Sequence, residues 1–119
     1  MITVSEGLSI GFVVLEQLRN DAALKNTEVY VECFQNCREN GLTFTVHNNK
    51  GEGKTWCVYE HRNSDDIIVN SKNDWTSFNG DLPYKADSKW VYDMAFRYDE
   101  ISKCADYLKK EFLNYAKKS

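Results

Sequence analysis

The stretch from residue 42 to residue 70, LTFTVHNNKGEGKTWCVYEHRNSDDIIVN, constrains the fold more than any other part of the chain. Apolar and polar residues alternate from Leu42 to His47, which is typical of a strand with one buried face. Residues 48–53 supply Asn and Gly, which tolerate the backbone conformations of a turn. Residues 54–61 and 67–69 are rich in β-branched and aromatic side chains. The stretch therefore predicts a three-stranded antiparallel meander.

The expected pairing of these strands sorts their side chains into two faces. We expect His47 to lie opposite Thr55, and His61 to lie opposite Asp66 across a tight turn. A slip of one residue would invert both faces, so their clean separation supports this register. The apolar face is then expected to carry Leu42, Phe44, Val46, Trp56, Val58, Ile67 and Val69. The opposite face is expected to carry Thr43, Thr45, His47, Thr55, Cys57, Tyr59 and His61.

Length and composition indicate a single globular domain over residues 1–119. The chain has 42% hydrophobic and 28% charged residues with one proline, which is ordinary for a folded domain of this size. Its formal net charge is −3. Nucleic-acid binding usually requires a concentrated basic surface, so nucleic acid is an unlikely partner.

The start of the chain does not have the features of a secretion signal. No Lys or Arg precedes the first apolar run, and Glu6 stands where positive charge would be expected. The run ends at Glu16 and is too short to cross a membrane. We therefore expect a cytoplasmic protein with no membrane contact, in which the four cysteines are reduced. The spacing of Cys33 and Cys37 is not that of a zinc site, and we expect neither metal nor cofactor.

The first forty residues are expected to form two helices. Thr3 and Glu6 match a capping box, and apolar residues follow at helical spacing. Residues 27–40 are ambiguous, because residues 28–34 also alternate as a strand would. We favour a helix there on the basis of four residues at positions i, i+3, i+4 and i+7. These four are Tyr30, Cys33, Phe34 and Cys37.

The last third of the chain predicts a loop, a strand and a helix. Residues 71–88 are polar and contain the aromatic residues Trp75 and Phe78. Residues 89–98 alternate as a fourth strand, and Asp99 is a suitable N-cap for the final helix. The strand is expected to face the helices with Trp90, Tyr92, Met94, Phe96 and Tyr98. The final helix is expected to bury Ile101, Cys104, Ala105, Leu108, Phe112, Tyr115 and Ala116.

These elements together predict a two-layer α+β fold. Two N-terminal helices and a C-terminal helix would pack on one face of a four-stranded, mainly antiparallel sheet. The other face would be open to solvent unless residues 71–88 cover it. A covered face would remove a binding surface there, and an open one would keep it.

The predicted binding surface is the outer face of the meander, with Tyr59 at its centre. Tyrosine provides a large contact area at low entropic cost, and Thr43 and Thr45 lie on the neighbouring strand. The rim would carry His61, Arg62 and Asp66. The loop around Trp75 and Phe78 is a second candidate for the binding surface.

The sequence has no identifiable catalytic signature. A His61–Asp66 pair is suitable for general-base chemistry, but a cross-strand pair beside a turn explains the same residues structurally. We therefore expect a small intracellular module that binds another protein, of an inhibitor, immunity or phage accessory type. The alternatives are a small enzyme or nucleotide-binding domain using His61 and Asp66, and a binder of single-stranded nucleic acid using the outer face. The sequence is also compatible with a homo-oligomer.

Overall fold

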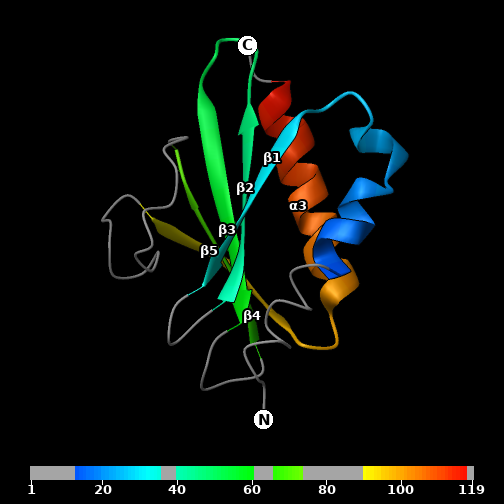
Figure 1. Ribbon diagram of the computed structural model, residues 1–119, viewed down its shortest axis with the longest axis vertical. Coiled ribbons are helices and arrows are strands. Elements are labelled where there is room, and N and C mark those ends of the chain that lie inside the picture. Colours follow the sequence, from blue (N-terminus) through cyan, green and yellow to red (C-terminus); the bar gives the residue numbers. More distant parts are fainter. Residues whose placement is uncertain (1–12, 36–39, 61–65, 74–89, 118–119) are drawn as a thin grey trace.

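The computed structural model describes residues 13–35, 40–60, 66–73 and 90–117. Within these residues, five strands form one sheet in the order β1-β2-β3-β4-β5, and all neighbours are antiparallel. A helical segment at residues 13–19, the short 3-10 helix η1 (Ala22–Leu24) and helix α3 (Ile101–Ala116) lie on one side of the sheet (Figure 1). The strands are β1 (Val29–Gln35), β2 (Asn40–His47), β3 (Gly53–Glu60), β4 (Asp66–Lys72) and β5 (Val91–Arg97).

The predicted architecture of four strands and three helices is wrong, because the expected second helix is largely strand β1. Residues 29–35 pair with β2 along their whole length, from Val29 opposite Val46 to Gln35 opposite Asn40. A short window can satisfy both the helical and the strand period, and tertiary pairing then decides between them. Here the β-branched residues Val29 and Val31 complete the hydrogen bonding of β2. The overall class, an α+β fold with helices beside an antiparallel sheet, is as predicted.

The predicted register between β2 and β3 is wrong by two residues. Val58 lies opposite Leu42, and Gly53 rather than Thr55 lies opposite His47. The turn sets this offset, because the Asn48 N–H donates to the Glu52 carbonyl at 2.9 Å. Since side chains alternate with period two, a shift of two residues leaves every side chain on its predicted face.

The predicted register between β3 and β4 is confirmed over the described pairs. Tyr59 lies opposite Ile68 and Thr55 opposite Lys72, the same offset as the predicted pairing of His61 with Asp66. His61 itself lies outside the described residues. All seven residues predicted for the apolar face are buried in the core: Leu42, Phe44, Val46, Trp56, Val58, Ile67 and Val69.

Strand β5 is confirmed, but the prediction that one set of its side chains faces the helices holds for only part of it. Phe96 is buried in the core, whereas Trp90 packs against the cluster of Cys57 and Tyr59 outside the core. The register shifts between Val69 and Asn70, which leaves an extra residue on β5. Such a bulge inverts the alternation of the residues beyond it.

Helix α3 fixes the C-terminal end of the chain to the sheet. It packs against β2 and β5, and its buried residues match the predicted stripe. Asp99 is not the N-cap; Glu100 occupies that position, and its carboxylate accepts the Arg97 backbone N–H at 2.9 Å. In the helical segment 13–19, Val14 and Leu18 are buried in the same core. The predicted capping box at Thr3 and Glu6 lies outside the described residues.

Candidate functional site

The centre of the predicted binding surface is buried. Tyr59 is only 6% exposed, and Thr43 on the neighbouring strand is also buried. The Tyr59 hydroxyl accepts a hydrogen bond from the Asn70 amide at 3.4 Å, and the Thr45 and Thr55 hydroxyls are 2.9 Å apart. The expectation that Tyr59 faces solvent is therefore wrong. The assignment of this face as the binding surface stays a prediction, and the burial of its centre argues for the sheet edges instead.

The predicted rim residues are not brought together within the described part of the chain. Asp66 is half-buried at the start of β4, opposite Arg97 of β5. His61 and Arg62 lie outside the described residues. The same is true of the secondary loop candidates, Trp75 and Phe78.

The described residues contain no cluster of three or more His, Cys, Asp or Glu side chains suited to hold a metal ion. Cys57 and Cys104 are both fully buried. Burial raises the pKa of the Cys104 thiol to about 12, because the thiolate would lose its hydration. Neither thiol has the solvent exposure of a reactive cysteine.

We expect this burial to protect both thiols in the folded protein. At pH 8, Cys57 and Cys104 should react with a thiol reagent far more slowly than the same residues in denatured protein. Under non-reducing denaturation, all four cysteines of the chain should titrate as free thiols. Two stable disulfides in the denatured sample, or rapid labelling of both residues in the folded one, would contradict this expectation.

Strand β5 forms an outer edge of the sheet and carries large apolar side chains that are open to solvent. Val91 is 60% exposed, Tyr92 62% and Met94 39%. Val91 lies opposite Ser71 and Met94 opposite Val69, whereas Tyr92 lies opposite Asn70. Large side chains on both faces of β5 therefore border the edge of the strand. Sequence alternation alone missed this edge, because it assigned Tyr92 to the helix side together with Met94, whereas only Met94 lies on that side.

A set of polar contacts holds β5 from its helix side. The Ser71 hydroxyl donates to one Asp93 carboxylate oxygen at 2.8 Å, and the Tyr107 hydroxyl lies 3.3 Å from the other. The Tyr107 oxygen is also 3.2 Å from a Glu111 carboxylate oxygen. Burial, followed by the negative charges of Asp93 and Glu111, raises the pKa of Tyr107 far above its usual range. A neutral Tyr107 therefore links α3 to the bulged residue of β5.

The opposite outer strand, β1, is also partly apolar but differs in charge and contacts. Tyr30 is 50% exposed, and its ring meets that of His47 edge-on with centroids 5.7 Å apart. The Glu28 carboxylate raises the pKa of the Tyr30 hydroxyl by hydrogen bonding and by its charge. Glu28 and Glu32 flank this tyrosine and are exposed. Charged residues on an edge strand discourage pairing with another strand. Tyr92 of β5 differs in this respect, because its charged neighbour Asp93 is held by Ser71 and Tyr107.

No helix among the described residues has the length and apolarity needed to cross a membrane. Comparison of the chain with protein families, curated proteins and solved structures gives no match in any of the three. The geometry of the described residues therefore provides the basis for assigning a function.

Proposed function

We propose that this protein binds another protein, and that the outer edge of β5 accepts an extended segment of that partner as an additional strand. The supporting observation is the exposure of Val91 and Tyr92, each more than half open to solvent on an outer strand. Folded proteins usually protect such edges with charged residues, proline or a covering element. An edge strand with exposed apolar side chains is the type of surface that recognises another chain.

The side chains of β5 are suitable for this mode of recognition. In strand addition, main-chain hydrogen bonds provide affinity and alternate side chains provide specificity. Tyr92 lies on the outer face, where its ring adds a large contact area at a small entropic cost. The contacts of Asp93 with Ser71 and Tyr107 hold the strand before the partner arrives. A pre-ordered strand lowers the entropy cost of binding.

We also propose a biological role for the complex of this protein with its partner. A single domain of 119 residues that acts by binding is suitable as an inhibitor, an immunity-type protein or a phage-type accessory protein. We place it in the cytoplasm, as the cysteine content and the start of the sequence predict.

The test compares two tyrosines on opposite edges of the sheet. Immobilised wild-type protein, Tyr92→Lys and Tyr30→Lys are each exposed to lysate of the source cells, and the retained protein is then purified for binary binding measurements. We expect Tyr92→Lys to weaken binary binding by at least about tenfold, because a hot-spot residue contributes about 2 kcal/mol or more and a loss of ~1.4 kcal/mol already corresponds to tenfold. Tyr30→Lys adds the same charge on the other edge and should bind as the wild type does.

Three outcomes of the binding measurements would contradict the proposal. The two variants could lose binding equally, the Tyr92 variant could bind as tightly as the wild type, or the wild type could retain no specific protein. Light scattering on the purified chain tests whether β5 instead pairs with β5 of a second copy. A dimer that only Tyr92→Lys dissociates would replace the heterologous partner with a copy of this chain and so contradict the proposal in its present form.

A further inference from the structure

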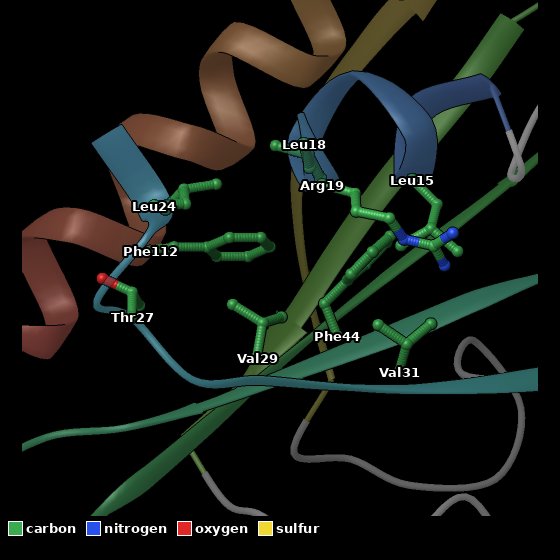
Figure 2. Close-up of a pocket in the computed structure, with 9 residues that line it drawn as sticks. All are labelled: Leu15, Leu18, Arg19, Leu24, Thr27, Val29, Val31, Phe44 and Phe112. Atoms are coloured by element: carbon green, nitrogen blue, oxygen red, sulfur yellow. The ribbon is translucent and has the colours of Figure 1, made fainter. Parts of the chain in front are cut away.

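A cavity of about 280 Å³ lies between the helical segment 13–19, η1, β1 and the core. Figure 2 shows side chains from these elements pointing into a common space above β1. The cavity is far from β5 along the sheet, since β1 and β5 are the opposite outer strands. Its apolar walls include Leu15, Leu18, Leu24, Val29, Phe44 and Phe112.

The walls belong to the packed core of the protein. Leu18, Leu24, Phe44 and Phe112 are all buried, and the rings of Phe44 and Phe112 lie 5.7 Å apart. The lining is nonetheless not purely apolar, because Arg19 and Thr27 also border the cavity and it is partly open to solvent. A site that combines apolar walls with a few polar groups favours a ligand that has both a hydrocarbon part and a polar part.

The polar groups of the cavity lie at its two ends. Figure 2 shows Thr27 on one side and the Arg19 guanidinium on the other, beside Leu15. Arg19 Nη1 is 2.8 Å from the Glu16 carboxylate, and both side chains are more than half exposed. An exposed pair of this type contributes little stability, so a ligand carboxylate can replace Glu16 at small cost. The planar guanidinium also suits a carboxylate, because it can form two parallel hydrogen bonds.

We propose that this cavity binds a small amphipathic carboxylate, with its hydrocarbon part among the apolar walls and its carboxylate paired with Arg19. The volume is slightly below the range of about 300–1,000 Å³ that is usual for drug-sized ligands, which favours a short alkyl chain or a single ring. This ligand site is independent of the protein-binding edge at β5. Small-ligand pockets commonly combine apolar walls with a few polar groups that fix orientation.

The first test uses octanoate as the probe and octan-1-ol as its uncharged counterpart. We expect octanoate to shift the methyl NMR signals of Leu18, Leu24 and Val29 in a saturable manner. Arg19→Gln should weaken octanoate binding roughly tenfold, since the variant loses a charge-assisted hydrogen bond to the ligand carboxylate. The same variant should leave octanol binding unchanged. Arg97→Gln removes an equal charge at the end of β5 and should not alter either affinity.

The second test fills the cavity. Val31 lines it from β1 and is 37% exposed, so a larger side chain can be accommodated without disturbing the core. Val31→Phe should reduce binding of both octanoate and octanol, whereas Tyr30→Phe at the neighbouring position should not. Circular dichroism establishes that each variant is folded, and Arg19→Gln at an exposed position keeps the test decisive if Val31→Phe does not fold.

The proposal is overturned if octanoate produces no saturable shifts in the wild-type protein. It is also overturned if folded Val31→Phe binds octanoate normally, because the ligand would then lie elsewhere. Equal weakening by Arg19→Gln and Arg97→Gln would show a general charge effect instead of a specific pair. Unchanged octanoate affinity in Arg19→Gln would exclude Arg19 as the carboxylate partner and overturn the assigned ligand class.

Discussion

Phe112→Ala should lower the free energy of unfolding by roughly 3–5 kcal/mol, the usual cost of removing a large aromatic side chain from a core. Phe112 has no exposed surface and lies at the centre of the contact between α3 and the sheet. Its ring centroid is 5.0 Å from that of Trp56 and 5.7 Å from that of Phe44. Alanine would leave a void that these two rings, held on paired strands, cannot readily close.

Urea denaturation of the wild type and the variant measures this loss. Asn114→Ala is the matched control, because Asn114 is an exposed residue of the same helix and its replacement should change the stability by less than about 0.5 kcal/mol. A loss below about 1 kcal/mol for Phe112→Ala would contradict the packing of α3 on the sheet. It would mean that this stripe of the helix faces solvent or another subunit.

Tyr59→Ala should also cost about 3 kcal/mol, although the sequence placed this residue on an open surface. The side chain is 6% exposed and packs with Cys57, Ile68 and Trp90 on the face opposite the helices. The substitution therefore removes buried aromatic area, and it leaves the Asn70 amide without its hydroxyl partner. Both effects destabilise the fold.

Tyr59→Phe separates the two effects. It keeps the ring and removes the hydroxyl, so it should cost only about 1 kcal/mol, the typical value of one hydrogen bond. Urea denaturation again provides the measurement. If Tyr59→Ala is as stable as the wild type, this face is open in solution, and the original assignment of Tyr59 as a surface residue is restored.

The meander was predictable because its signals are local. Alternation identified β2 and β3 and sorted their side chains correctly, since each polar or apolar position reports its own face. The register between β2 and β3 was less accessible to prediction. It depends on the turn, where the Asn48 side chain accepts the backbone N–H groups of Lys50 and Glu52 at 2.9 and 3.0 Å. Gly51 completes this turn with a φ of 80°.

Strand β1 shows where local signals fail. Residues 29–35 fit both a helical and a strand period, and pairing with β2 resolves the ambiguity. That pairing is a tertiary interaction, which no window around Val31 contains. The bulge in β5 is a similar case, because the extra residue is defined only by the partner strand. The exposed edge at Tyr92 depends on this bulge and on the position of β5 as an outer strand.

The cavity could not be predicted from the sequence either. Leu15, Val29 and Phe112 come from three distant parts of the chain, and each fits an ordinary apolar stripe. Only the assembled fold shows that these stripes leave space between them. The reduced state of the four cysteines stays a prediction, whereas the complete burial of Cys57 and Cys104 is visible only in the assembled fold.

Hydrogen–deuterium exchange on the complex with the purified partner tests the central claim, that β5 receives an added strand. The account predicts slower exchange for the backbone amides of Val91–Arg97 when the partner is bound, with no change for Val29–Gln35 of the opposite edge. Slower exchange in β1, or in β2 and β3, with β5 unchanged would contradict it.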